Sequence, residues 1–127
     1  MNKFFQFNEF VQLGKIFSDC EAYLISLEYF DKAIALSYLP INKDRLVEAY
    51  ELRGSVNKFL NKYLESIDDY SKGIELDPKN SYLYFGRGMS YEYLGQNEEA
   101  LNDLKMSLLI DPNNSLVIDM IDYLQKK

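Results

Sequence analysis

The chain has 127 residues, enough for one domain with its own core, and 47% of them are apolar. Its net charge of −6 at pH 7 argues against nucleic-acid binding, because nucleic-acid binders usually display a concentrated basic face. With no His and a single Cys, the chain cannot assemble the common zinc sites or nucleophile–base pairs. The composition therefore predicts no enzyme, no metal site and no cofactor.

No segment approaches the roughly 20 apolar residues that span a bilayer, so we expect no membrane insertion. The N-terminal segment also lacks the uninterrupted apolar stretch and the cleavage site of a signal peptide. Cys20 has no partner for an intramolecular disulfide, which fits a reducing compartment, and we expect it to be half-buried. These features predict a cytoplasmic protein, although a domain cut from a longer chain would look the same.

Two apolar stripes with helical spacing follow each other at the start of the chain. The first is formed by Phe10, Leu13 and Phe17, and the second by Tyr23, Leu27, Phe30 and Ile34. This spacing predicts a pair of helices, each of roughly 14 residues and about 20 Å long. Pro40 cannot continue a helix, and Asn42 or Asp44 could cap the next one, which we expect to start near Lys43.

Residues 47–80 and 81–114 carry the same pattern twice, thirty-four residues apart and without an insertion. Residues 7–46 follow it with six extra residues. A fixed period of this length predicts a stacked array of helix pairs, because one pair alone cannot bury its apolar face. Asn61 and Gly95 fall at the turns within pairs, where a left-handed residue can close the first helix. The matching positions are Tyr50 and Tyr84, Arg53-Gly54 and Arg87-Gly88, Asp69 and Asp103, and Asp77-Pro78 and Asp111-Pro112.

Small residues recur at one place in the first helix and at one place in the second helix of every unit. A glycine inside a helix costs about 1 kcal/mol relative to alanine, so another contact must explain its use. We expect the helices of each pair to cross closely at these places, where a bulky side chain would overpack. The small residues are Gly14, Gly54 and Gly88 in the first helices and Ser26, Ser66 and Ala100 in the second.

After residue 114 the pattern begins a fourth time and stops. Residues 115–127 carry an apolar stripe with helical spacing, but no second helix follows. This segment therefore predicts a capping helix over the last pair, one that covers the apolar side chains of Met106 and Leu109. The stripe consists of Leu116, Val117, Met120, Ile121 and Leu124.

The order of an aromatic residue, a glycine, a second aromatic, a small residue and a proline resembles the tetratricopeptide repeat (TPR) family. The resemblance implies a single all-α domain over residues 1–127, a right-handed α-solenoid of three tandem helix-turn-helix repeats plus a C-terminal capping helix. It also implies protein binding rather than catalysis. Arg87 and Leu104 depart from the pattern, which the third unit carries at Tyr84, Gly88, Tyr91, Ala100 and Pro112.

In this family the first helices line a concave groove that holds a segment of the partner. The third unit is the apolar end of the groove here, and we expect Gly86 to leave a hollow among its rings. The acidic surroundings, which include Glu48 and Glu51, favour a segment with apolar anchors and Lys or Arg flanks. The alternative that the rings only pack against neighbouring first helices stays open. The corresponding groove residues are Val11, Lys15, Leu52, Ser55, Phe59, Tyr82, Phe85, Met89 and Tyr93.

Chaperone-binding members of the family carry a clamp of Lys, Asn and Arg that grips a C-terminal Glu-Glu-Val-Asp peptide. The clamp is missing from this chain, which disfavours the role of a chaperone adaptor. The corresponding places hold Val11, Lys15, Leu52, Tyr82 and Gly86.

Two arginines each stand sixteen residues before an aspartate, at places where the first unit has Leu13 and Tyr29. Because the two places change together, we predict ion pairs that join the first helix of a unit to the second, with ligand binding by the arginines as the alternative. The adjacent carboxylates Asp68-Asp69 and Glu98-Glu99 indicate solvated surface rather than acid–base chemistry. The predicted pairs are Arg53 with Asp69 and Arg87 with Asp103.

The sequence thus predicts a protein–protein interaction scaffold whose groove holds a peptide segment of a partner. One alternative is a homo-oligomerisation module that forms a dimer through the apolar N-terminal edge. Another is the recognition arm of a larger enzyme or regulatory assembly. The N-terminal edge would consist of Phe4, Phe5, Leu24 and Ile25.

Overall fold

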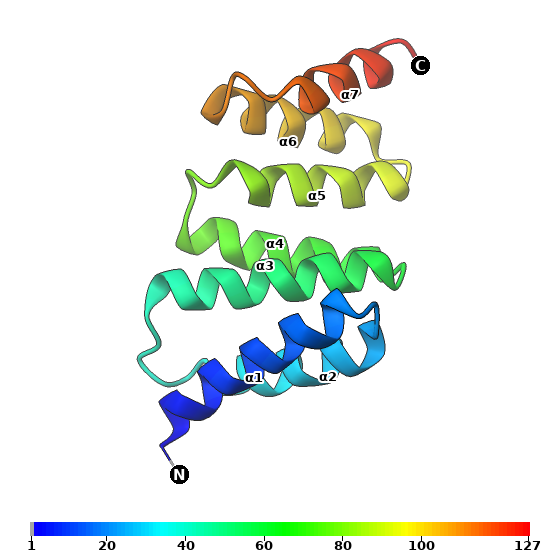
Figure 1. The fold of residues 1–127 in the computed structure, drawn as a ribbon. Helices are drawn as coiled ribbons and strands as arrows, with labels where there is room; N and C mark the ends of the chain where they lie inside the picture. Colours follow the sequence, from blue (N-terminus) through cyan, green and yellow to red (C-terminus); the bar gives the residue numbers. More distant parts are fainter. Residues whose placement is uncertain (1) are drawn as a thin grey trace.

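The structure is a computed structural model that describes residues 2–127, and this part of the chain forms seven α-helices. They stack in chain order as three antiparallel pairs and a last single helix, with the two termini at opposite ends of the column (Figure 1). The predicted α-solenoid is confirmed. The helices are α1 (Lys3–Asp19), α2 (Tyr23–Ile34), α3 (Lys43–Phe59), α4 (Tyr63–Leu76), α5 (Ser81–Tyr93), α6 (Asn97–Ile110) and α7 (Ser115–Gln125).

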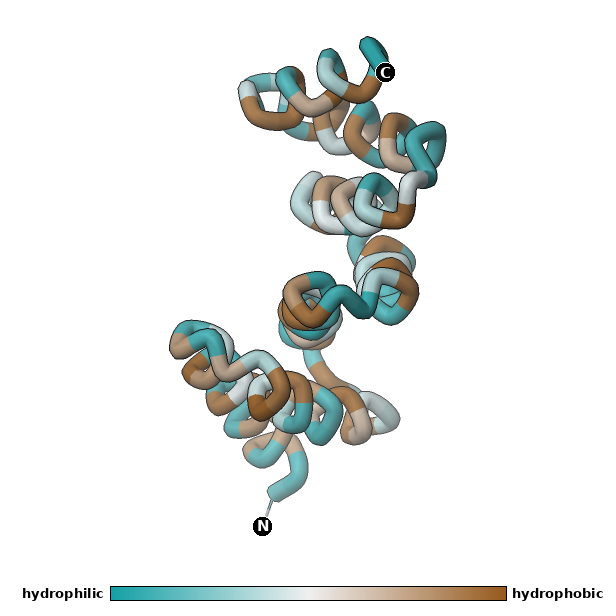
Figure 2. The backbone as a smooth tube through the Cα atoms, turned by 90° about the vertical axis from the view of Figure 1, so that its right-hand side faces the viewer, coloured by the Kyte–Doolittle hydropathy of each residue, from teal (hydrophilic) through white to brown (hydrophobic). Residues whose placement is uncertain are grey.

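The column is curved, and its first helices lie on the inner side of the curve (Figure 2). Each pair packs on the next through the second helix of one and the first helix of the other, as α2 does on α3 and α4 on α5. In addition α1 contacts α3 and α3 contacts α5, while the second helices make no comparable contact with one another. The face of α1, α3 and α5 is therefore the concave one.

An asparagine side chain caps the start of α1, α3, α5 and α7. Asn42 Oδ1 accepts a hydrogen bond of 2.9 Å from the Asp44 backbone N–H, and Asn80 Oδ1 accepts one of 3.1 Å from Tyr82. Such caps satisfy backbone donors that have no partner within the helix. The expected start of α3 at Lys43 is confirmed, and Asn42 rather than Asp44 caps it.

The second helices begin differently, because each follows a tight turn closed by a left-handed residue. The expected left-handed residues Asn61 and Gly95 have φ of 62° and 77°, and Glu21 occupies the same place in the first pair with φ of 58°. No side chain caps α2, α4 or α6. A short, stiff connection therefore links the two helices of every pair.

The predicted close crossing within each pair is present, and it includes a polar contact. A Cβ added to Gly14 would collide with the ring of Phe30, which lies directly on the α1 backbone. The buried Ser26 Oγ donates a hydrogen bond of 2.8 Å to the Gly14 carbonyl, and Ser66 Oγ does the same to Gly54. A serine in place of the small apolar residue thus adds a buried hydrogen bond at the crossing.

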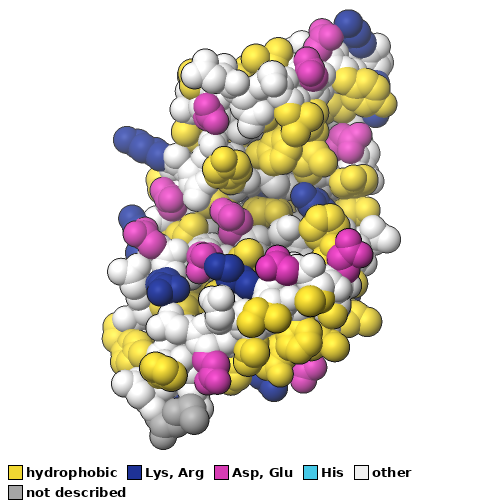
Figure 3. Space-filling model, in the orientation of Figure 1, with side chains coloured by type: hydrophobic (Ala, Val, Ile, Leu, Met, Phe, Trp, Pro, Cys, Tyr) yellow, Lys and Arg dark blue, Asp and Glu magenta, His cyan; other side chains and the backbone are white. Residues whose placement is uncertain are grey.

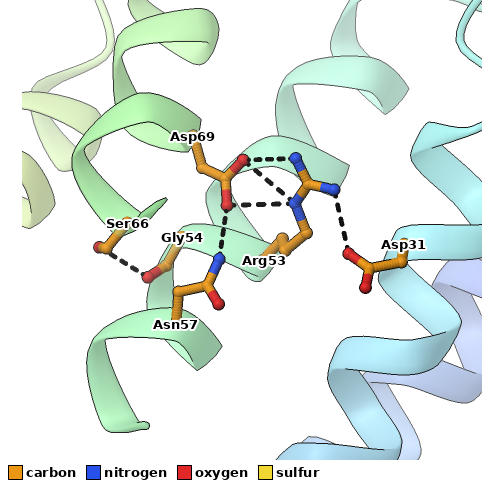
Figure 4. Close-up of polar contacts among 6 residues, drawn as sticks. All are labelled: Asp31, Arg53, Gly54, Asn57, Ser66 and Asp69. Carbon is orange, nitrogen blue, oxygen red and sulfur yellow. Dashed lines mark hydrogen bonds and ion pairs between the residues drawn. The ribbon is translucent and has the colours of Figure 1, made fainter. Parts of the chain in front are cut away.

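Arg53 forms its predicted ion pair with Asp69 and also reaches a third helix (Figure 4). Its Nη2 lies 2.7 Å from Asp69 Oδ1, while its Nη1 lies 3.1 Å from Asp31 Oδ1 on α2. Asn57 Nδ2 donates a further bond of 2.9 Å to Asp69. Arg53 therefore joins α3 both to its own partner α4 and to the preceding pair.

The second predicted ion pair repeats this arrangement one unit later. Arg87 Nε and Nη2 each donate a hydrogen bond of 2.8 Å to Asp103, and Nη1 reaches Ser71 Oγ on α4 at 3.1 Å. The hydrogen bonds that Arg87 donates to Asp103 raise the pKa of Arg87 above its ordinary value, against the opposing effect of burial. Both predicted ion pairs are present and join the first helix of a unit to the second.

The capping helix α7 covers different side chains from those expected. Val117 and Leu124 are buried against Ala100 and Leu104 of α6. Met106 and Leu109 remain 40% and 76% exposed, because they lie on the face of α6 turned away from α7, so that expectation was wrong. The stripe on α7 is also narrower than predicted, since Leu116 is 57% exposed.

The apolar residues of the expected N-terminal edge are exposed, but they do not form one edge. Phe4 and Phe5 lie at the start of α1, whereas Leu24 and Ile25 lie at the start of α2, next to the end of α1. Because the two helices are antiparallel, about 20 Å of helix separates the two groups. Cys20 is exposed rather than half-buried. Within residues 2–127 no helix is long and apolar enough to cross a membrane.

Candidate functional site

Two neighbouring pockets open along α3 on the concave face, one towards α5 and the other towards the connection between α4 and α5. We name them by their walls. The aromatic pocket has a volume of about 190 Å³, and the acidic pocket of about 310 Å³. Glu51 lines both, so the two pockets lie next to each other. The aromatic pocket is lined by Glu51, Leu52, Ser55, Lys58, Tyr70, Tyr82, Phe85 and Gly86, and the acidic pocket by Asp44, Val47, Glu48, Glu51, Asp77 and Asn80.

On the concave face, charged side chains and apolar side chains gather at different heights along the stack of helices. Figure 3 shows acidic and basic side chains gathered at the level of α3, with large apolar groups above them at the level of α5. Tyr82, at the start of α5, is 68% exposed. The two pockets lie where these two kinds of surface meet.

Four of the nine predicted groove residues lie together in the aromatic pocket: Leu52, Ser55, Tyr82 and Phe85. Val11 is only 3% exposed and belongs to the core around Phe7 and Phe30, so its inclusion in the groove was wrong. The alignment of the repeats correctly places Val11 on α1, but the side chains of neighbouring helices cover it.

Two further predicted residues lie away from the pockets. Lys15 forms an ion pair with Glu48, with 3.6 Å between Nζ and Oε2. The charge of Lys15 is thus partly neutralised by another residue of the chain. Met89 is half-buried on α5 and lines neither pocket.

The last two predicted groove rings pack against the preceding helix pair. Phe59, the last residue of α3, stacks on Tyr23 with 5.0 Å between ring centroids, and Tyr93 stacks on Tyr63 at 5.1 Å. In both cases the partner is the first residue of a second helix, whereas the packing alternative placed it on a first helix. These stacks join successive pairs at one edge of the column.

Gly86 lines the aromatic pocket, but the space left by its missing side chain is filled. The ring of Tyr70 occupies the space that a Gly86 side chain would fill, and it also lies against Gly54. Tyr70 comes from the second helix α4 and forms the floor of the aromatic pocket. Burial, together with the charge of Glu51, raises the pKa of its hydroxyl well above the ordinary value.

Lys58 and Tyr70 are pocket residues that the sequence-based groove did not include. Tyr70 lies on a second helix, and the rule that first helices line the groove excludes it. The signal that could have identified it is the pair of glycines, Gly54 and Gly86, on the two helices that its ring separates. Lys58 lies next to Phe59 and carries no distinguishing pattern.

Two charges of opposite sign on the aromatic pocket are half-buried without an ion-pair partner in residues 2–127. Burial raises the pKa of Glu51 above its ordinary value, and the negative charge of Glu48 adds to the effect. Burial lowers the pKa of Lys58. By contrast, Glu48 lies within ion-pair distance of both Lys15 and Arg45. The pocket can therefore offer one carboxylate and one ammonium group to a ligand.

No group of three or more His, Cys, Asp or Glu side chains in the described part of the chain is arranged to hold a metal ion. Of the adjacent carboxylates, Asp69 is buried against Arg53, so the expectation that it is solvated was wrong. Asp68, Glu98 and Glu99 are exposed, as expected.

Models of the tetratricopeptide repeat family match residues 47–80 and 81–114. No curated protein sequence matches the chain significantly. Among solved structures, the TPR domain of Arabidopsis OM64 is similar, with a TM-score of 0.89, 20% identity and 98% of each chain covered. The second TPR domain of human RPAP3, solved in complex with an HSP70 peptide, has a TM-score of 0.86 and 24% identity, over 97% of this chain and 98% of that one.

A third similar structure is the Hsp90 co-chaperone Cns1 from Saccharomyces cerevisiae, with a TM-score of 0.88 and 22% identity. The match covers 94% of this chain but only 38% of Cns1. At this level of identity the likeness concerns the fold. The two stretches matched by the family models, however, make up more than half of the sequence and repeat at its internal period. The chain belongs to the tetratricopeptide repeat family.

Proposed function

We propose that the protein is an interaction scaffold that holds a peptide segment of a partner protein against the concave face. The observation that carries this proposal is the aromatic pocket between α3 and α5. Its wall contains the exposed ring of Tyr82 and the half-buried ring of Phe85, which can bury an apolar side chain of a ligand. The RPAP3 domain of the same fold is solved with a bound peptide, which supports this use of the fold.

The partner that we propose is not a chaperone tail. Only Lys15 among the five clamp places carries a positive charge, and it pairs with Glu48. Val11 is buried, and Gly86 is covered by Tyr70. The surface around the groove is acidic and would repel the carboxylates of such a tail.

Partner capture tests this function. The tagged protein is incubated with native lysate, and bound proteins are identified by mass spectrometry for the wild type, for Tyr82→Ala/Phe85→Ala and for Tyr123→Ala. Tyr123 is a matched control, since it is 60% exposed but lies on α7. We expect the groove variant to lose a set of proteins that the wild type and the control both retain. Equal capture by all three folded proteins would contradict the proposal.

A homo-oligomerisation module is the second candidate, and one observation favours it. Leu24 and Ile25 lie beside Leu60 around an apolar pocket of about 430 Å³ at the turn edge of the column. Size-exclusion chromatography with light scattering tests this candidate. A dimer that Leu24→Ser converts to a monomer would support it, and a monomeric wild type at all concentrations would exclude it.

Four further points complete the proposal. We propose that the chain has no catalytic activity of its own, because it has no His and only one Cys from which to build a nucleophile–base pair. The net charge of −6 supports a role without nucleic acid. A cytoplasmic location is supported by the single exposed thiol of Cys20. A role as the recognition arm of a larger assembly is compatible with Cns1, whose chain extends far beyond the matched part.

A further inference from the structure

The charges on the aromatic pocket are arranged along α3 in a definite order. Asp44 and Glu48 lie on its first two turns and Glu51 at its middle, Leu52 and Ser55 follow, and Lys58 lies near its end. Glu51 and Lys58 are seven residues apart, which corresponds to about 10.5 Å along the helix. The pocket thus has a negative end and a positive end with apolar surface between them.

Neighbouring charges on α1 and α3 are already paired with one another. Glu48 pairs with Lys15 and Arg45, and the two arginines that face away from the groove pair with Asp69 and Asp103. Half-buried charges lose hydration, and without a counter-charge this loss is not offset. Perturbed ionisable groups on a cleft are found preferentially at functional sites. Two such groups of opposite sign on one pocket indicate a ligand that supplies both counter-charges.

We propose that the pocket binds an extended internal segment of the partner, with a Lys or Arg opposite Glu51, a large apolar residue over Tyr82 and Phe85, and an Asp or Glu opposite Lys58. This inference rests on the proposed function and specifies its ligand. An extended chain advances about 3.3 Å per residue, so the two charges of the segment are about three residues apart. The acidic pocket extends the negative field beyond Glu51, which fixes the end that the basic residue occupies.

The pockets have too few cationic side chains for a C-terminal segment, so the proposed segment is internal. Lys58 is the only cationic residue among those that line the two pockets. One ammonium group can neutralise one side-chain carboxylate. A C-terminal Asp or Glu would bring two carboxylates to the same place, and one of them would remain unpaired in a half-buried site.

Peptide selection with a charge-swapped variant tests the inference. Randomised dodecapeptides, displayed within a loop of a carrier protein, are panned against the wild type, against Glu51→Lys/Lys58→Glu and against Lys72→Glu/Glu75→Lys. The last variant is the matched control, because it swaps an exposed pair on α4 that lines neither pocket. All three proteins have the same net charge, and circular dichroism checks that each is folded.

We expect the wild type and the control to enrich the same basic, apolar and acidic order, with the two charges about three residues apart. The charge-swapped variant should enrich the reverse order of charges. For a synthetic copy of an enriched peptide with both ends blocked, Glu51→Gln and Lys58→Met should each weaken binding about tenfold in fluorescence anisotropy. These single neutral variants also provide the test if the swapped variant does not fold.

Several results would overturn the inference while leaving the proposed function intact. They are enriched peptides that lack the charge order but require Tyr82 and Phe85, unchanged selection by the swapped variant, and binding that requires a free C-terminal carboxylate. If no enriched peptide loses binding to Tyr82→Ala/Phe85→Ala, both the inference and the proposed function are wrong.

Discussion

At the scale of single residues, buried ion pairs hold the helices together. Asp69 is 3% exposed and accepts hydrogen bonds from both Arg53 and Asn57, so loss of the guanidinium leaves a buried carboxylate with one donor. Asp103 is 5% exposed and depends on Arg87 alone. Removing one member of such a pair leaves the other desolvated, which costs more than the intact pair contributes.

The first prediction concerns the Arg87–Asp103 pair. Arg87→Ala and Asp103→Ala should each lower the free energy of unfolding by about 1–3 kcal/mol, and the double variant should cost less than their sum. Urea denaturation measures all three. The exposed pair of Lys126 and Asp122 serves as the control, and its variants should change stability by less than about 0.5 kcal/mol. Strict additivity at Arg87 and Asp103 would rule out the contact.

The second prediction concerns Glu51, whose pKa is raised by burial and by Glu48. A carboxyl group with a raised pKa in the folded state favours folding when protonated, and this contribution is lost as the pH rises through its folded pKa. Glu51→Gln should therefore raise the melting temperature at neutral pH, and the gain should disappear below the ordinary pKa of 4.5. Glu48→Gln is the control. It should not stabilise, since Glu48 has two cationic partners.

A lower melting temperature for Glu51→Gln at neutral pH would show that the carboxylate has a stabilising partner within the chain. The predicted combination is instead a more stable protein that binds its partner more weakly. Such a trade-off is typical of groups retained for function rather than for stability.

At the scale of helices, the approach of α3 to α5 depends on the ring of Tyr70. This ring lies against Gly54 on α3 and occupies the space beside Gly86 on α5. The ring of Tyr70 thereby separates α3 from α5, and it also lines the aromatic pocket. The distance between α3 and α5 in the groove therefore depends on Tyr70, a residue of the second helix α4.

The third prediction is that Gly86→Ala destabilises the protein by about 1–3 kcal/mol, because the new methyl group collides with the Tyr70 ring. Combined with Tyr70→Leu, the same change should cost less than the sum of the two single changes. Thermal unfolding followed by circular dichroism measures these effects. An unaltered melting temperature for Gly86→Ala would mean that the ring does not occupy this space.

At the scale of the whole molecule, the solenoid is held by contacts between neighbouring pairs, and its last pair depends on α7. Val117 is fully buried against α6, and Leu101 and Leu108 pack partly against the same cluster. Without α7, the apolar side chains of α6 that it covers would form a continuous exposed surface. Stacked repeats generally require such a terminal helix for solubility.

The fourth prediction is that deletion of residues 115–127 lowers the melting temperature and promotes association, because the face around Leu104 becomes exposed. Differential scanning calorimetry and light scattering measure the two effects. Deletion of only residues 126–127 is the control, since both are exposed. A truncated protein that stays monomeric with an unchanged melting temperature would show that α7 contributes little to the fold.

The sequence by itself determined the features that are local or that repeat in register. The start of α3 after Asn42, the left-handed residues at Asn61 and Gly95, and the close crossings at the glycines all follow from neighbouring residues and the thirty-four-residue period. The Arg–Asp pairs were predictable because both partners change together between units.

Only the tertiary structure decided how successive pairs pack against one another. Periodicity specifies which residues lie on a helix, but not the angle and distance at which the next pair docks. For that reason the burial of Val11 and the exposure of Leu109 could not be derived from the sequence. The same holds for the unpaired charges of Glu51 and Lys58, because the absence of a partner depends on every side chain that the folded chain brings near.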